Sequence, residues 1–137
     1  NGMTLGADPE FAQELARFRN LHVRVSIKGT NAKEYAKLTG AMPESYELPY
    51  RALGYLIAAG VSCNACLMVS FSDDDGIKAA ERRLYDVHPG LLKSLERENI
   101  TLFPKVAKRL KKEGLMPTAV RRRGSIVALT TDAATRV

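Results

Sequence analysis

The chain has 137 residues, enough for one domain with a core of ordinary size. Hydrophobic residues make up 45% of it and charged residues 26%, the composition of a globular protein. Because no apolar run reaches the roughly 18 residues that span a bilayer, we expect no membrane partner. The two cysteines exclude a disulfide framework of the secreted type. No secretory signal is visible, which favours the cytoplasm.

The first part of the chain predicts one helix and one strand. Asn1-Gly2-Met3 reads like the end of a strand entering a loop, and we expect the natural protein to extend before it. Asp8 and Pro9 are typical of a helix start, and this helix should end near Arg19. Residues 21–28 alternate in polarity and are rich in β-branched side chains, which predicts a strand.

The middle of the chain continues the alternation of helices and strands. Asn31 caps a second helix that Gly40 closes, and a third helix should begin near Pro49 and stop at Gly60. The second strand is predicted in residues 61–71. Helices in residues 77–84, 89–98 and 104–112 follow, with a short strand in residues 100–102.

Such alternation predicts parallel strands joined by crossover helices, with too few strands to close a barrel. The predicted fold class is therefore α/β, a fragment of a partial (β/α) barrel in residues 1–116. Residues 117–137 change in character, with three consecutive arginines, an apolar run and a small polar end. We interpret them as a basic tail that is either a loose strand or disordered.

One face of the first predicted strand is polar along its whole length. Parallel strands buried on both faces are normally apolar, so either a polar barrel lumen or a solvated edge strand must explain this face. The second strand has a milder polar face. Ligands of α/β proteins bind at the carboxyl ends of strands, where the ammonium of Lys28 could meet a carboxylate or phosphate. The polar side chains are His22, Arg24, Ser26 and Lys28 on the first strand, and Asn64, Cys66, Met68 and Ser70 on the second.

Cys63 and Cys66 have the spacing of a CxxC motif. Redox and zinc sites place this motif in turns or at helix starts, where both sulfurs converge. Here the motif lies within a predicted strand, and strand residues three apart point to opposite faces. We therefore expect buried structural cysteines and no metal site.

Several segments in order resemble the radical S-adenosylmethionine (SAM) superfamily. They are LHVRVSIKGTN in residues 21–31, EYAKLTG in residues 34–40, residues 60–72, and the opening Asn-Gly-Met, which resembles the end of a Thr-Asn-Gly strand. Over residues 1–117 the chain resembles relatives of pyruvate formate-lyase activating enzyme. The resemblance implies an enzyme that binds a 4Fe–4S cluster through a CxxxCxxC loop. It implies that the enzyme cleaves SAM reductively and starts hydrogen-atom abstraction from a substrate that the sequence does not identify.

The resemblance also implies roles for particular residues. We expect cofactor contacts from Asn1, Ser26, Lys28, Met68 and Ser70, and a lumen lined by His22, Arg24, Asn64 and Cys66. Ser26 stands where the activating enzymes have an acid. The cluster loop is absent from this chain, so we expect the chain alone to hold neither cluster nor cofactor and to be inactive. A missing N-terminal half of the barrel would be its partner.

The net charge of +6 raises a second hypothesis, a small basic α/β module that binds nucleic acid without catalysis. We expect instead that the charge sits on exposed helix faces and in the tail, because few aromatic side chains accompany the basic ones. Nucleic-acid binding that weakens steeply with salt would favour the second hypothesis.

Overall fold

A computed structural model describes residues 1–129 of the chain. No helix among these residues has the length and apolar character needed to cross a membrane. The helices and strands follow one another along the chain in this order: α1 (Met3–Ala7), α2 (Pro9–Leu15), β1 (His22–Lys28), α3 (Ala32–Thr39), the 3-10 helix η1 (Pro43–Tyr46), α4 (Glu47–Ala58), β2 (Ser62–Met68), α5 (Asp74–Val87), α6 (Gly90–Lys93), β3 (Glu96–Glu98), α7 (Pro104–Lys112), β4 (Ala119–Arg122) and β5 (Ser125–Ala128).

Capping side chains set the starts of several helices. The Asn31 carboxamide accepts the Glu34 N–H at 2.9 Å, and α3 ends at Gly40 with φ 74°, as predicted. The Asp73 carboxylate accepts the Gly76 N–H at 2.7 Å, so α5 begins three residues before the predicted start. The helix that starts at Pro9 ends at Leu15 rather than near Arg19, and the chain turns before β1.

The first three strands form a parallel sheet in the order β1-β2-β3. His22 of β1 pairs with Ser62 of β2 and the register continues to Lys28 and Met68; Cys66 to Met68 then pair with β3. Helices α3 and α4 connect β1 to β2, and α5 and α6 connect β2 to β3. The predicted α/β class with parallel strands and crossover helices is confirmed, and the described residues form no closed barrel.

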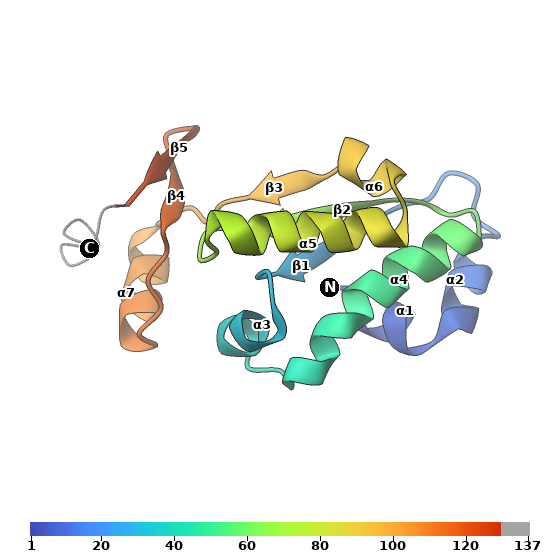
Figure 1. Cartoon of the computed structure of the whole chain (residues 1–137), viewed down its shortest axis with the longest axis horizontal. Helices are drawn as coiled ribbons and strands as arrows, with labels where there is room; N and C mark the ends of the chain where they lie inside the picture. The colour runs from blue at the N-terminus through green and yellow to red at the C-terminus, as the bar shows by residue number, and fades with distance from the viewer. Residues whose placement is uncertain (130–137) are drawn as a thin grey trace.

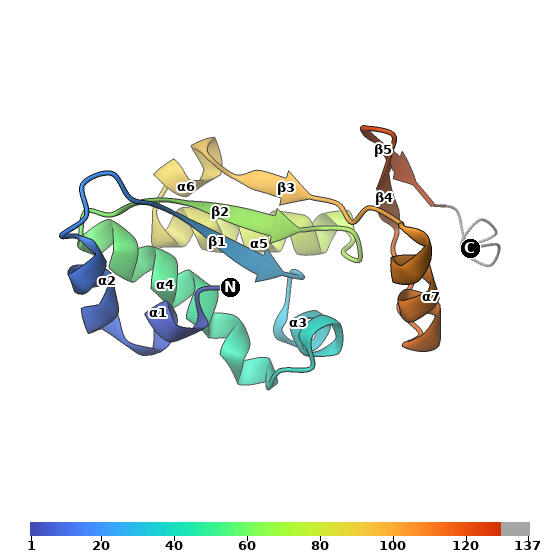
Figure 2. The same cartoon turned by 180° about the vertical axis from the view of Figure 1, so that it is seen from behind.

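Helices cover one face of this sheet, and no helix among residues 1–129 covers the other. Figure 1 shows α4 and α5 on the near side, and Figure 2 shows the strands in front of these helices. Each fully buried aliphatic side chain stabilises the fold by about 1.5–3 kcal/mol. The apolar residues between sheet and helices include Val25, Ile27, Ala65 and Leu67 from the strands, and Leu53, Leu56, Ala80 and Leu84 from the helices.

Three local predictions differ from the structure. Asn1 and Gly2 form no strand; they precede the short helix α1, and the Asn1 carboxamide accepts the Met3 N–H at 3.2 Å. The helix predicted in residues 89–98 ends at Lys93, after one turn. The chain then forms β3, because pairing with β2 outweighs the helix propensity of this segment. The predicted strand 100–102 contributes a single bridge, between Thr101 and Arg121.

Helix α7 and the β4–β5 hairpin form a separate lobe, the C-terminal appendage (residues 104–129), beyond the carboxyl ends of the parallel strands (Figure 1). Backbone hydrogen bonds attach it to the sheet. The Ser70 carbonyl accepts the Thr118 N–H at 2.6 Å, and the Ile100 carbonyl accepts the Arg121 N–H at 2.8 Å. Val120 is fully buried. Residues 119–128 of the predicted tail are thus paired strands, and residues 130–137 lie outside the described part.

Candidate functional site

The face of the sheet that no described helix covers is polar, and we call it the polar face. It carries alternate residues of β1, whose neighbours Val25 and Ile27 are buried against the helices. The parallel register places the polar residues of β2 and β3 beside them. The polar face comprises His22, Arg24, Ser26 and Lys28 of β1, Ser62, Asn64, Cys66 and Met68 of β2, and Glu96 and Glu98 of β3. The polar side chains predicted on β1 therefore lie on the same face of the parallel sheet as those predicted on β2.

An ion-pair cluster crosses the three strands on this face. The Arg24 guanidinium reaches over β2 to Glu96 at 2.9 Å and to Glu98 at 2.6 Å, and the Lys28 ammonium lies 3.8 Å from Glu98. Hydrogen bonds from Arg24 lower the pKa of both carboxyl groups, and the two carboxylates raise the pKa of Arg24. Arg24, Glu96 and Glu98 are therefore all charged at neutral pH.

Hydrogen bonds extend the cluster toward the amino ends of the strands. On the imidazole of His22, Nδ1 lies 2.7 Å from the Ser62 hydroxyl oxygen, and Nε2 lies 2.9 Å from the Asn64 carboxamide oxygen. The Asn64 amide group in turn donates to Glu96 at 2.7 Å. His22 and Arg24 are thus linked through Asn64 and Glu96, and the side chains predicted to line a lumen belong to one connected network.

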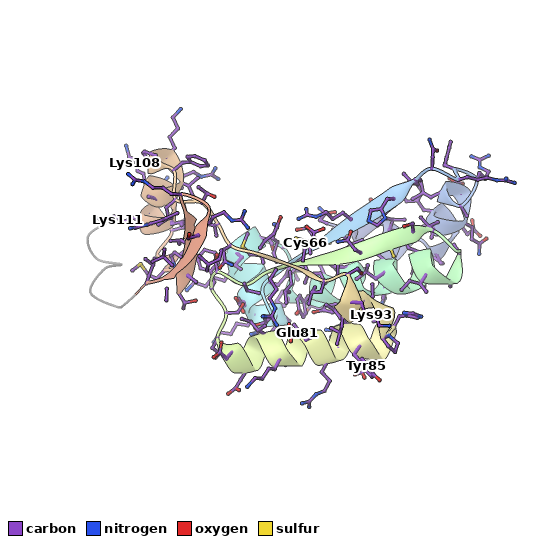
Figure 3. The ribbon with its side chains drawn as sticks, turned by 90° about the horizontal axis from the view of Figure 1, so that it is seen from above. Cys66, Glu81, Tyr85, Lys93, Lys108 and Lys111 are labelled. Atoms are coloured by element: carbon purple, nitrogen blue, oxygen red, sulfur yellow. The ribbon has the colours of Figure 1, made fainter. Side chains whose placement is uncertain are left out.

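The thiol of Cys66 lies beneath this network. The residue is fully buried, and Arg24 Nη2 is 2.8 Å from its sulfur. Burial, with a smaller contribution from the Glu98 carboxylate, raises the pKa of the thiol to about 12. Figure 3 shows Cys66 on the side of the sheet opposite Glu81 and Tyr85 of α5. The thiol therefore stays protonated at neutral pH and is no ready nucleophile.

Cys63 belongs to the other face, as the strand geometry predicted. It packs against the apolar core, and burial raises the pKa of its thiol too. Among residues 1–129, no three His, Cys, Asp or Glu side chains come together as a metal site would require. The described part of the chain thus offers no ligand set for an iron–sulfur cluster.

Ser26 occupies the centre of the polar face and lacks a hydrogen-bond partner. Its hydroxyl oxygen is the one buried side-chain oxygen or nitrogen in the described part of the chain without such a partner. Register places it beside Cys66 and between Arg24 and Lys28 along β1. An unsatisfied buried hydroxyl costs about 1–3 kcal/mol, and no open surface of this oxygen is left for a ligand unless its neighbours move.

Met68 lies at the carboxyl end of the polar face, on the wall of an open pocket of about 400 Å³. Arg24 and Glu98 form part of the same wall, and Arg121 of the C-terminal appendage closes one side. Met68, Arg24 and the end of the sheet are therefore brought together as predicted, with an appendage residue that the sequence did not place there.

Asn1 and Ser70, the other residues predicted to contact a cofactor, lie apart from the ion-pair cluster. Asn1 is exposed next to α1, and a side chain on Gly2 would meet Val25 at 2.9 Å, so the first residues lie against the helix-covered side of β1. Ser70 is fully buried. Its hydroxyl accepts the Ile100 N–H at 2.8 Å and donates to Asn99 at 3.3 Å, so both of its hydrogen-bonding roles are already used.

Sequence reasoning missed Glu96 and Glu98, because it assigned them to a helix. The alternating Glu-Arg-Glu pattern was the available signal: Arg97 pairs with Glu81 of α5 on the helix side, while the two glutamates lie on the polar face.

A second missed group lies at the carboxyl edge of the sheet. The Glu34 carboxylate accepts hydrogen bonds from the Thr30 N–H at 3.1 Å, the Thr30 hydroxyl at 2.9 Å and the Ser72 hydroxyl at 2.6 Å. The group lines an open pocket of about 340 Å³. Because three donors satisfy the carboxylate, we interpret it as a clamp that ties the loops after β1 and β2 together.

Comparisons of this chain with protein-family models, with curated proteins and with solved structures find no match to any of them.

Proposed function

We propose that this chain is the later part of the core of a radical SAM enzyme, and that its polar face lines the cofactor and substrate cavity. One observation carries the proposal: a parallel sheet with helices on a single face presents a connected row of charged and polar side chains on the other. A sheet that is to be covered by a second layer of helices would be apolar there. The lumen of a barrel that holds a polar ligand would instead be lined by polar side chains.

The free edge of β1 supports the idea that the sheet is part of a partial barrel. No described strand pairs with that edge, and Gly2 packs closely against Val25 and Ala52 on the helix-covered side of β1. A strand leading into residues 1–2 would extend the sheet at the free edge. The N-terminal half of the barrel is accordingly the partner that we propose for this surface.

The described residues do not fit an iron–sulfur cluster. Cys63 and Cys66 lie on opposite faces of β2, and no third ligand joins either of them among residues 1–129. We therefore place the 4Fe–4S cluster on a CxxxCxxC loop outside this chain.

The polar face does fit SAM. Lys28 can pair with a carboxylate, and the thioether of Met68 can pack against a flat ring. When bound, SAM would supply the radical that abstracts a hydrogen atom. The part of this chain would be to orient it: the Arg24–Glu98 pair fixes the position of Lys28, and the buried Cys66 contributes shape rather than reactivity.

The test begins with the coding sequence upstream of residue 1, which we expect to encode a CxxxCxxC motif. The longer protein, reconstituted anaerobically with iron and sulfide, should convert SAM to 5′-deoxyadenosine. Lys28→Ala should weaken the apparent affinity for SAM by about tenfold or more, because a hydrogen bond to a charged group is lost. Lys78→Ala is the matched control, since Lys78 is exposed on α5, on the opposite side of the sheet. Absence of the motif, or of 5′-deoxyadenosine, would refute the proposal.

A further inference from the structure

The positive charge of the chain is concentrated in the C-terminal appendage. Residues 104–129 contain eight lysines and arginines and a single glutamate, a net charge of +7. Because the whole chain carries +6, all other residues together carry −1. The charge is thus not spread over the surface but belongs to one lobe, a distribution typical of a surface that binds a polyanion.

All eight basic side chains are exposed, and no described carboxylate pairs with any of them. They are Lys105, Lys108, Arg109, Lys111 and Lys112 of α7, and Arg121, Arg122 and Arg123 of the hairpin. The cations of the polar face, by contrast, are held in ion pairs. Figure 3 shows Lys108 and Lys111 on α7, remote from the labelled residues of the sheet and α5. These charges are therefore available to an external partner.

Helix α7 presents four of its five basic side chains in one direction. Positions 105, 108, 109 and 112 lie within about one third of the helix circumference, given 100° per residue. Val106, Ala107 and Leu110, on the opposite side, are half-buried. The helix lies beside β4 (Figures 1 and 3), so its basic side and the arginines of the hairpin belong to one lobe.

The tip of the hairpin contains an arginine in a conformation that few residues adopt. Arg123 has φ 47° and Gly124 φ 85°, the two positive angles of a type I′ turn. Asparagine or glycine is the favoured residue at the first of these positions, and other residues pay a conformational cost there. An exposed guanidinium at this tip, beside two further arginines, suits a phosphate.

We propose that the C-terminal appendage is a binding surface for single-stranded nucleic acid. Its basic side chains contact the phosphates, and Phe103, directly before α7 and 63% exposed, offers a ring on which a base can stack. The surface continues toward the polar face, because Arg121 shares the 400 Å³ pocket with Arg24 and Met68. From the sequence we expected the charge to lie on exposed helix faces and in the tail rather than to bind nucleic acid; its concentration in one lobe favours the binding surface proposed here. It is independent of the proposed function, since binding requires neither cluster nor SAM.

An anionic membrane fits the appendage less well. A helix that lies in a membrane surface buries a broad apolar side in the lipid, but the apolar side chains of α7 are already half-buried. Ile126 and Val127 of β5 are exposed, yet as neighbours in a strand they point to opposite faces and form no single insertion surface. The charge is therefore better matched to a flexible polyanion than to a flat bilayer.

Binding of the full chain to labelled oligonucleotides of about 20 nucleotides, followed by fluorescence anisotropy, tests this proposal. If five phosphates are contacted, the affinity for a single strand should fall about a hundredfold from about 50 to about 200 mM salt. Comparing the affinities for single-stranded RNA and DNA of the same sequence shows which of the two nucleic acids is the preferred ligand. Tighter binding to the duplex, no binding at low salt, or binding to anionic vesicles but not to oligonucleotides would each overturn the proposal.

Variants with matched charge locate the surface. Replacing Lys108, Arg109 and Lys112 together by Gln should weaken binding at least tenfold and reduce the salt slope by about two. The control replaces three exposed lysines outside the appendage and should leave binding within about twofold, although it removes the same charge. An equal loss in the control would show that net charge alone binds the oligonucleotide and would overturn the assignment. The control positions are Lys33, Lys37 and Lys78.

Two single variants separate binding from stability. Arg123→Asn should stabilise the chain slightly, because asparagine tolerates a positive φ, yet weaken binding about threefold. Phe103→Leu should weaken binding about fivefold or more without changing the salt slope. Unchanged affinity in both variants, with melting temperatures retained, would contradict the arrangement proposed here.

Discussion

The thiol of Cys66 offers a quantitative test of the polar face. In a Cys63→Ser variant, Cys66 is the one remaining thiol. Its pKa of about 12, against an ordinary value of 9.0, leaves about a thousandfold less thiolate at a pH of about 8. Each thiolate formed is about twentyfold more reactive, because a more basic thiolate is a stronger nucleophile. Alkylation should therefore be about fiftyfold slower than in the unfolded chain, and slower still because the residue is fully buried.

Alkylation with iodoacetamide, followed by intact mass over a range of pH, measures this rate. The rate should keep rising with pH to about 11 without reaching a plateau, because the thiolate fraction is still growing there. The same variant unfolded in guanidinium is the reference. Glu98→Gln should speed the reaction, because it removes a carboxylate that raises the pKa of the thiol.

Two results would refute this account of Cys66. One is a rate in the folded variant within a few-fold of the unfolded rate. The other is a Cys63–Cys66 disulfide in the wild-type chain after mild oxidation, because residues on opposite faces of a strand cannot approach closely enough to form one.

Three further predictions concern the frame around the site. Gly6→Ala should lower the free energy of unfolding, measured by heat or denaturant, by about 3 kcal/mol, because the new Cβ would lie 2.0 Å from a backbone carbonyl oxygen of α4. Gly54→Ala is the control: its nearest contact would be at 3.8 Å, so it should be neutral or stabilising. Ser70→Ala should cost about 1–3 kcal/mol, seen as faster hydrogen exchange of the Ile100 amide, since it removes the acceptor of that backbone N–H. The lowered pKa of Glu98 stabilises the folded chain above its ordinary value of 4.5, and this stabilisation is lost as the pH falls below that value. An Arg24→Gln variant should lose less of its stability in acid, and an unchanged pH profile would contradict the ion pair.

Much of the sheet could be read from local pattern. The alternation in residues 22–28 and 62–68 placed both strands and assigned every side chain to a face, because the side-chain period of a strand is two whatever surrounds it. The same period predicted that Cys63 and Cys66 diverge. Asn31 and Gly40 marked the limits of α3, because capping is decided within one turn of the helix.

The third strand could not be read in this way. Residues 89–98 favour a helix by composition, and only the exposed edge of β2 makes Glu96 to Glu98 extended. The two carboxylates that pair with Arg24 belong to β3. The ion pairs of the candidate site could therefore not be predicted without knowing that this segment is a strand.

In the appendage, too, some features follow from the sequence and others from the tertiary structure. The sequence by itself determined how many charges the last part of the chain carries, and it set the turn that Gly124 allows. Only the tertiary structure decided that those charges form one exposed lobe attached through Ser70, with Arg121 against the polar face. Composition and short-range periodicity are properties of neighbouring residues. Which side chains meet across strands, by contrast, depends on contacts between residues about 70 positions apart, as for Arg24 and Glu96.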